Sequence, residues 1–269
     1  MRPPRVLAIG TAALTAFAAA LIGTVIPANA ATAVHYVALG DSYSSGVGAG
    51  STSGSCSQSP NAYPSLWATA NSPASFTFAA CSGATTSDVI SSQLSSLNSS
   101  TTLVSITIGG NDVGFSSIME TCVLGSTSSC ESAVSSAETY ANNTLPGQLN
   151  TTLADIHSHA PNAKVVVLDY PVFYDTSVSV CIGLSSADHT AIDAGINDLD
   201  GVIKTAAANN NATFADVRSQ FSGHEICDSS AWLHSLNILD ISESYHPTAA
   251  GQSGGYLPVF STAAASVGQ

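Results

Sequence analysis

Positive charge is scarce in this sequence. Its 269 residues include 5 Lys and Arg against 18 Asp and Glu, and charged residues make up only 9% of the chain. A nucleic-acid-binding protein gains most of its affinity from basic side chains that neutralise phosphates. So few basic residues cannot form such a surface, and we exclude nucleic acid as a partner.

Motifs for metals and cofactors are lacking as well. The chain has no C-x-x-C pair and no H-E-x-x-H, and His157 and His159 face different sides of their predicted helix. The glycine-rich segment 46–50 has neither the third glycine of a dinucleotide-binding loop nor the Gly-Lys of a P-loop. We interpret this segment as a flexible lip, and we expect no metal and no cofactor.

The N-terminus has the features of a targeting segment. Arg2 and Arg5 precede an apolar run over residues 6–26, and residues 28–30 have the small-x-small pattern of a secretory cleavage site. A membrane anchor is the alternative, but Gly and Thr interrupt the run and no basic stop-transfer cluster follows. We therefore predict a signal peptide at 1–30 and a secreted, extracellular protein without integral membrane association.

The rest of the chain, residues 31–269, is predicted to be a single domain, because no linker or repeat divides it. Only Lys164, Lys204 and Arg218 remain there against all 18 acidic residues, which gives a formal net charge of −15. Such a surface excludes polyanionic partners. We expect a monomer whose contact with a lipid interface is at most transient.

Short β-rich segments alternate with helix-like segments along this domain. The candidate strands are residues 34–40, 75–80, 103–109, 164–170 and 213–217. The clearest candidate helices are residues 87–97, 131–159, 187–208 and 248–265. This alternation predicts an α/β fold in which helices cover both faces of a parallel sheet.

All six cysteines follow the predicted signal peptide, and an even number in an exported chain indicates three disulfides. The layout of the strands suggests a set of pairs, provided that the strand order is flavodoxin-like. These pairs are Cys122–Cys130 within one loop, Cys56–Cys81 after two neighbouring strands, and Cys181–Cys227 at the other edge of the sheet.

In an open parallel sheet, ligands bind beyond the carboxyl ends of the strands. Small residues with a hydroxyl or an amide follow three of the predicted strands, in residues 40–44, 80–83 and 109–112. A serine becomes an effective nucleophile only when a base removes its proton and hydrogen-bond donors await the oxyanion. Ser42, His246, Gly83 and Asn111 supply these groups, so we hypothesise acyl transfer.

A second serine pattern does not fit this chemistry. Residues 251–255 match G-x-S-x-G, but they follow His246 and no predicted strand precedes them. We assign them to the final helix.

Four blocks of the chain resemble the SGNH, or GDSL-type, hydrolases, in particular the secreted actinobacterial lipases, esterases and phospholipases of that superfamily. The blocks are GDSYSSG (40–46), ACSGATTSDV (80–89), ITIGGND (106–112) and SYHPTAAGQ (244–252). The resemblance implies Ser42 as nucleophile and oxyanion donor, Gly83 and Asn111 as further oxyanion donors, and His246 as general base. It also implies three disulfides and a three-layer α/β/α sandwich around a five-stranded parallel sheet.

The group that orients His246 is open at this point. The family usually has Asp three residues before the histidine, where this chain has Glu243. Either the Glu243 carboxylate reaches the imidazole, or a main-chain carbonyl, that of Ser244, holds the ring. We favour Ser244, because some secreted members of the family use a carbonyl.

The substrate is expected to be apolar. Apolar side chains follow the fourth predicted strand and the Asn111 block, at Val172, Phe173, Tyr174, Ile182, Leu184 and Phe115. These side chains suit an acyl chain, although they can also pack beneath loops. We predict hydrolysis of lipid or other carboxylic esters by a lipase, phospholipase A1 or broad esterase. The alternatives are a carbohydrate O-deacetylase of the same fold and a non-catalytic binding module.

Overall fold

A parallel five-stranded sheet lies at the centre of the structure, a computed structural model that describes residues 1, 3–4, 33–178, 181 and 183–269. The strands are β1 (His35–Gly40), β2 (Ser75–Phe78), β3 (Leu103–Thr107), β4 (Lys164–Leu168) and β5 (Thr213–Ala215). Their order is β2-β1-β3-β4-β5, and every neighbouring pair is parallel. The α/β fold and the flavodoxin-like strand order are confirmed. The predicted signal peptide lies almost wholly outside the described residues.

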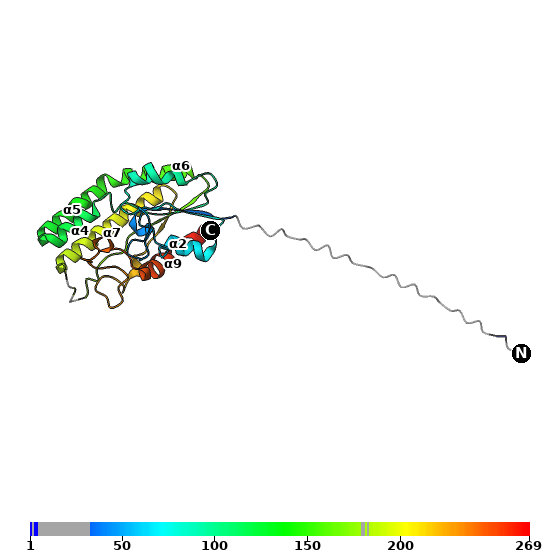
Figure 1. Cartoon of the computed structure of the whole chain (residues 1–269). Coiled ribbons are helices and arrows are strands. Elements are labelled where there is room, and N and C mark those ends of the chain that lie inside the picture. Colours follow the sequence, from blue (N-terminus) through cyan, green and yellow to red (C-terminus); the bar gives the residue numbers. More distant parts are fainter. Residues whose placement is uncertain (2, 5–32, 179–180, 182) are drawn as a thin grey trace. The chain divides into compact units, whose positions relative to one another are not determined.

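The central strands are apolar because helices cover both faces of the sheet. Every residue of β3 is buried, as are all residues of β1 except His35 and all of β4 except Lys164. A strand buried on both faces has a continuous apolar sequence rather than an alternating one. Figure 1 shows the sheet between two groups of helices, with α2 and α9 on one side and α5, α6 and α7 on the other.

The helices begin and end as follows. They are α1 (Ser42–Ser45), α2 (Tyr63–Asn71), α3 (Thr86–Asp88), α4 (Phe115–Leu124), α5 (Thr127–Asn143), α6 (Leu145–His159), α7 (Ser186–Asn209), α8 (Arg218–Phe221) and α9 (Leu257–Ser266). Within the described part of the chain, none of them is both long and apolar enough to cross a bilayer.

The structure corrects the predicted helix over 131–159. Two helices, α5 and α6, occupy this region and meet at Thr144. Pro146 lies in the first turn of α6, where the missing N–H of a proline costs nothing, whereas inside one long helix it would break the hydrogen-bond ladder. Helices α2 and α4 and the one-turn helices α1 and α8 lie outside the ranges predicted for helices.

Three disulfides tie the loops of this domain together. They join Cys56 to Cys81, Cys122 to Cys130, and Cys181 to Cys227, the pairs that the layout of the strands suggested. The first of them fixes the loop after β2 to the segment that follows α1. It therefore holds together two of the loops at the carboxyl edge of the sheet.

Gly40 lets the first of these loops approach β3 closely. Its φ is +120°, and a Cβ at this position would lie 2.5 Å from the carbonyl oxygen of Thr107. We expect Gly40→Ala to lower the free energy of unfolding by about 2–5 kcal/mol, from backbone strain and overpacking together. Urea denaturation measures the change.

The matched control for this substitution is Gly147→Ala in α6. Gly147 has nothing within 4 Å of the position of a Cβ, and its φ is not positive. Alanine is favoured over glycine inside a helix, so this variant should be as stable as the parent or more stable by about 0.5–1 kcal/mol. Equal stability of both variants and the parent would show that Gly40 is not required for the close approach.

Candidate active site

The sharp turn after β1 presents Ser42 at the carboxyl edge of the sheet. Asp41 caps α1 by accepting a hydrogen bond from the N–H of Tyr43 (3.0 Å), and Ser42 is the first residue of this helix. The turn is fixed from below by Gln93, whose buried amide binds both the N–H and the carbonyl of Gly40 (2.8 and 2.9 Å). Hydrogen bonds to Gly40 and Tyr43 therefore fix the backbone on both sides of Ser42.

The imidazole of His246 lies against the Ser42 hydroxyl. The distance from Nε2 to Oγ is 2.7 Å, although the two residues are separated by 204 positions in the chain. The other ring nitrogen, Nδ1, is 3.0 Å from the carbonyl oxygen of Ser244. When Nδ1 carries the proton and donates it to this carbonyl, Nε2 has a free lone pair for the serine proton.

Of the two groups that sequence analysis offered for orienting His246, the main-chain carbonyl of Ser244 is the one at hydrogen-bonding distance. The Glu243 carboxylate instead lies 3.5 Å from the side-chain amide of Asn237. Glu243 touches the histidine only through its backbone, because its carbonyl accepts the N–H of His246 (3.1 Å).

A strained turn brings the Ser244 carbonyl to the ring. Tyr245, between the two residues, has a φ of 66°, which an L-residue adopts only at a cost. The cost is offset by contacts: the Tyr43 hydroxyl donates to the Tyr245 carbonyl (2.6 Å), and the Tyr245 N–H donates to the His234 carbonyl (2.9 Å). A hydrogen bond thus joins α1, which carries Ser42, directly to the turn of residues 244–246, which we call the histidine turn.

The site lowers the pKa of His246 to about 4. Loss of hydration on burial is the main cause, and the nearby His234 acts in the same direction, while the Ser244 carbonyl opposes them. His234 itself is held at 2.8 Å from the carbonyl oxygen of Gly48. His246 is therefore a neutral base at any pH above this value.

The two other predicted oxyanion donors lie in adjoining loops. Asn111 lines the same pocket as Ser42, and its Nδ2 donates one hydrogen bond to the carbonyl of Ala84 (3.0 Å), which leaves its second Nδ2 proton available. Gly83 precedes Ala84 and has a φ of +80°, with open space on the side where a Cβ would lie. It does not line the pocket itself; its loop is fixed to the end of β1 because the N–H of Cys81 donates to the Gly40 carbonyl (2.9 Å).

Tyr170 was not predicted from the sequence. It connects the turn after β1, which carries Asp41 and Ser42, to the loop that carries Gly110 and Asn111. Its hydroxyl donates to the Asp41 carboxylate and accepts the N–H of Gly110 (3.1 Å). Asp41 also accepts a hydrogen bond from the Thr107 hydroxyl (2.7 Å). The only sequence signal was its position as the last residue of the fourth predicted strand, next to the apolar residues from which an acyl-binding surface was predicted.

Burial raises the pKa of the Asp41 carboxyl to about 6, and the hydrogen bonds from Tyr170, Thr107 and the Tyr43 N–H oppose the rise. Asp41 is 1% exposed, and its carboxylate is bound by the Tyr43 N–H and the hydroxyls of Thr107 and Tyr170. It acts on the site through the backbone that it holds.

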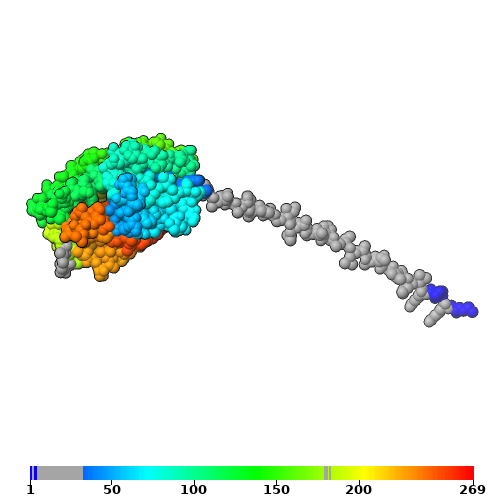
Figure 2. Space-filling model, viewed as in Figure 1, coloured from blue at the N-terminus to red at the C-terminus, as the bar shows by residue number. Residues whose placement is uncertain are grey.

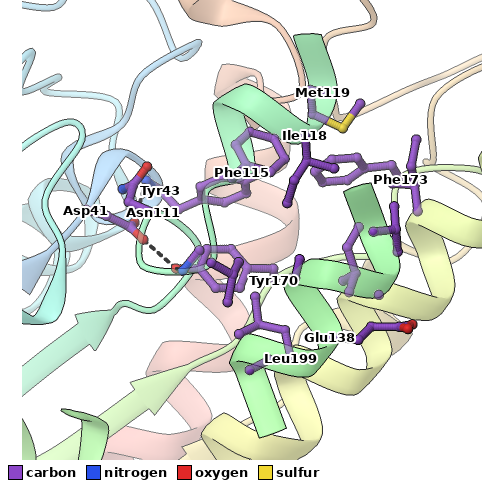
Figure 3. A pocket seen from close by; sticks show the side chains of 18 of the residues that line it. Asp41, Tyr43, Asn111, Phe115, Ile118, Met119, Glu138, Tyr170, Phe173 and Leu199 are labelled. Carbon is purple, nitrogen blue, oxygen red and sulfur yellow. Dashed lines mark hydrogen bonds between the residues drawn. The ribbon is translucent and has the colours of Figure 1, made fainter. Parts of the chain in front are cut away.

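An apolar pocket runs inward from Ser42 between α4, α5 and α7. Figure 3 shows Asp41, Tyr43 and Asn111 at one end and Glu138 at the other, with hydrophobic side chains between them. Phe115 and Phe173, which were predicted from the sequence, belong to its wall. Val172, Tyr174 and Leu184 do not line it, and Ile182 lies outside the described residues.

The glycine-rich segment 46–50 is not a flexible lip. Its residues are buried except for Gly50, and a Cβ on Gly48 would lie 2.9 Å from the Pro247 carbonyl, so the segment packs beneath the histidine turn. The G-x-S-x-G segment forms a π-helical turn, Gly251–Tyr256, that continues directly into α9, so it was rightly assigned to the helical end of the chain. Its Gly254 lies against the ring of Trp232 (2.8 Å from a Cβ position).

Metal binding has no support from the described side chains, which contain no group of three or more His, Cys, Asp and Glu placed to hold an ion.

Comparisons with known proteins agree with this arrangement. The model of the GDSL-like Lipase/Acylhydrolase family matches residues 38–253. The chain is 54% identical over 269 residues to Lipase 1 of Streptomyces coelicolor, covering 98% of this chain and 100% of that one.

Two solved structures from the same genus are also similar. One is phospholipase A1 from Streptomyces albidoflavus NA297, with a TM-score of 0.84 and 53% identity over 86% of this chain and 99% of that one. The other is the extracellular lipase from Streptomyces rimosus, with a TM-score of 0.84 and 50% identity over 86% of this chain and 100% of that one.

The Tyr170 hydroxyl can be tested by Tyr170→Phe. The change leaves one oxygen of the Asp41 carboxylate, Oδ2, and the Gly110 N–H without their partner, while the Thr107 hydroxyl and the Tyr43 N–H still bind the other carboxylate oxygen. We therefore expect unfolding to require about 1–3 kcal/mol less. Displacement of both loops should lower kcat for a short soluble ester about 10-fold to 100-fold. Tyr140→Phe is the control, because it removes only a hydrogen bond to Gln148 on the helices away from the sheet edge. An unchanged kcat in Tyr170→Phe would show that Tyr170 does not position the site.

The lowered pKa of His246 predicts the acid limb of activity. His246 stays neutral as the pH falls, until the pH comes close to its pKa of about 4. We therefore expect kcat/KM for a soluble ester to stay near its plateau at about pH 5.5, where an ordinary histidine is mostly protonated. Circular dichroism at each pH separates titration from unfolding. A half-maximal kcat/KM at pH 6.5 or above, with the protein folded, would contradict this account.

Proposed function

The chain belongs to the GDSL-like lipase/acylhydrolase family, and from this membership we propose that it hydrolyses carboxylic esters of lipids through an acyl-enzyme on Ser42. The observation that carries the proposal is the 2.7 Å contact between the Ser42 hydroxyl and His246 Nε2 at one end of an apolar pocket. A serine nucleophile, its base and an apolar binding space are the parts that hydrolysis of a lipid ester requires.

In the first step the Ser42 oxygen attacks the ester carbonyl while His246 Nε2 takes its proton. The imidazolium that forms is stabilised by the Ser244 carbonyl, which accepts the hydrogen bond from Nδ1. His246 then gives the proton to the departing alkoxide, and the acyl group remains on Ser42. A carbonyl fixes the ring and its tautomer as a carboxylate does, but it adds only a partial charge.

The negative charge on the attacked oxygen is stabilised by three N–H groups. The Ser42 N–H lies at the start of α1, where the first amides of a helix have no partner within the helix. The second Nδ2 proton of Asn111 and the N–H of Gly83 complete the set. Removal of one such donor typically lowers kcat about 10²-fold to 10³-fold.

Deacylation uses the same groups in reverse order. Water takes the place of the leaving alcohol, and its oxygen attacks the acyl carbonyl while His246 removes its proton. The bond between the acyl carbon and the Ser42 oxygen then breaks, the carboxylic acid leaves, and His246 returns the proton to Ser42. Because the pKa of His246 is low, at about 4, the base returns to its neutral form after each proton transfer.

The pocket supports a long acyl chain rather than an acetyl group. Its wall consists largely of aliphatic and aromatic side chains, including Ile118, Met119, Ile196 and Leu199. Each buried methylene contributes about 0.8 kcal/mol. A lipase or phospholipase A1 is therefore favoured over a carbohydrate O-deacetylase, and the similar proteins from Streptomyces are named as lipases and a phospholipase A1.

We also propose that residues 1–30 are a signal peptide and that the protein acts outside the cell as a monomer. The basic and apolar pattern of the N-terminus supports export, as do three disulfides in Ala33–Gln269, which cytosolic proteins rarely contain. The solved lipase from Streptomyces rimosus is described as extracellular.

The mechanism is tested by a pair of substitutions. We expect Ser42→Ala to lower kcat at least about 10⁴-fold, since the nucleophile is gone. Glu243→Gln should stay within about threefold of the parent, because the structure gives its carboxylate no contact with the ring. Stopped assays with a p-nitrophenyl ester measure both. A loss of about 10³-fold or more in Glu243→Gln would mean that the carboxylate, and not the Ser244 carbonyl, supports His246.

The length of the acyl pocket is tested by Ala141→Leu. Ala141 is buried on α5 and lines the pocket, so a larger side chain occupies space meant for the substrate. We expect kcat/KM for a dodecanoyl ester to fall about tenfold relative to that for a butyryl ester, the value for two displaced methylenes. Ala208→Leu, on the exposed face of α7, should change neither value. An unchanged ratio in Ala141→Leu would place the acyl chain elsewhere.

A further inference from the structure

Large apolar side chains gather at the tip of the segment that carries the base. We call residues 234–246 the histidine loop and the side chains of Ile238, Leu239 and Ile241 its apolar tip. These side chains are 83%, 94% and 66% exposed. Of the large hydrophobic side chains that the structure shows as exposed, no other three lie so close together in the sequence. Exposed apolar clusters of this kind mark contact sites.

The histidine loop is closed at its base beside the active site. The N–H of His234 donates to the carbonyl of His246 (2.9 Å), and Leu233 pairs with Pro247 in an antiparallel bridge. In Figure 2 the orange part of the chain, which includes this loop, lies at the surface next to the blue segment that follows β1. A surface that binds the tip is therefore brought to the mouth of the catalytic site.

An aromatic wall continues from the loop into the acyl pocket. The ring of Tyr245 stacks on Phe173, with centroids 5.6 Å apart, and meets the edge of Phe115 at 6.4 Å. Phe115 and Phe173 both line the pocket. Through Tyr245, the histidine loop is thus packed against the wall of the space proposed for the acyl chain.

Several backbone N–H groups of the histidine loop donate to acceptors within the loop itself. Two N–H groups, those of Leu239 and Asp240, donate to the side-chain oxygen of Asn237 (3.1 and 3.2 Å). The N–H of Asn237 donates to the Ser244 hydroxyl (2.8 Å), and that of Ser242 donates to the Asp240 carboxylate (3.2 Å). Because these donors already have partners, moving the tip into an apolar medium leaves few of them unsatisfied.

The charges of the loop limit the kind of surface that it can meet. Asp240 and Glu243 are its only charged side chains, and the described part of the chain contains three Lys and Arg residues, none of them in this loop. Polybasic segments are what anionic membranes attract. The tip therefore fits an electrically neutral, zwitterionic lipid surface and is repelled by an anionic one.

From these observations we propose that the apolar tip docks the protein on a zwitterionic phospholipid surface and so presents the mouth of the acyl pocket to the lipid. This inference rests on the proposed function, because it names how the lipid reaches Ser42. A second copy of the chain is a weaker candidate for the occupant. A stable dimer buries roughly 800 Å² on each partner over a complementary surface, whereas three side chains on one loop form only a small, protruding cluster.

The test separates binding from catalysis. Ser42→Ala protein is co-sedimented with phosphatidylcholine vesicles, with the tip intact or carrying Ile238→Ser, Leu239→Ser and Ile241→Ser together. We expect the tip substitutions to lower the partition coefficient about 100-fold or more. The matched control is Leu124→Ser, which removes a 77% exposed leucine at the end of α4 and should stay within about twofold. Vesicles of phosphatidylglycerol should bind the intact protein more weakly at low salt, with a smaller difference at high salt.

Three results would overturn the docking proposal. They are equal binding with and without the tip, an equal loss in Leu124→Ser, and a dimer in sedimentation velocity that the tip substitutions dissociate. With Ser42 present, hydrolysis of monomeric p-nitrophenyl butyrate should be the same for the parent and the tip variant. Absence of this activity in the parent would contradict the proposed function alone, whereas activity without vesicle binding would contradict the docking proposal alone.

Discussion

The hydrogen bond between the Ser42 hydroxyl and His246 is the interaction on which the rest of the structure depends. Its partners come from opposite ends of the domain, and both are held by backbone that is fixed in several directions. Gly40 approaches β3 where no side chain fits, and Gln252 in the last helix donates to the Tyr43 carbonyl (2.9 Å). Tyr43 in turn holds the turn of Tyr245. The fold thus places a weak nucleophile and its base at a proton-transfer distance before any substrate arrives.

Burial of the Asp41 carboxylate beside the active site lowers the free energy of unfolding at neutral pH. In the folded protein the pKa of Asp41 is about 6, against an ordinary value of 3.8, so the folded state holds a proton more tightly than the unfolded chain does. The stability from this group is therefore gained as pH falls through 6 and is fully present below 3.8. Ionised Asp41 at pH 7 costs about 3 kcal/mol relative to a solvated carboxylate. In return, the buried carboxylate fixes the turn that carries Ser42 through its hydrogen bonds to Tyr43, Thr107 and Tyr170.

The fold and the reacting residues were largely predictable because both leave local signals. Continuous apolar segments identify the strands, and Ser42, Asn111 and His246 follow or precede elements at the edge where parallel sheets bind ligands. The role of Tyr170 leaves no such signal, because its partners Asp41 and Gly110 lie 129 and 60 residues away. The same holds for the choice between Glu243 and the Ser244 carbonyl. That choice depends on the positive φ of Tyr245, which the presence of a tyrosine at this position does not predict.

Covalent labelling shows whether Ser42 is an activated nucleophile, on which the proposed hydrolysis depends. A p-nitrophenyl alkylphosphonate is incubated with the folded protein, and the adduct is located by peptide mass spectrometry. We expect one equivalent of phosphonate, bound to the peptide at Ser42, and loss of the label in His246→Ala. A protein that stays unlabelled, or one that carries the label on Ser253 or another serine, would contradict it.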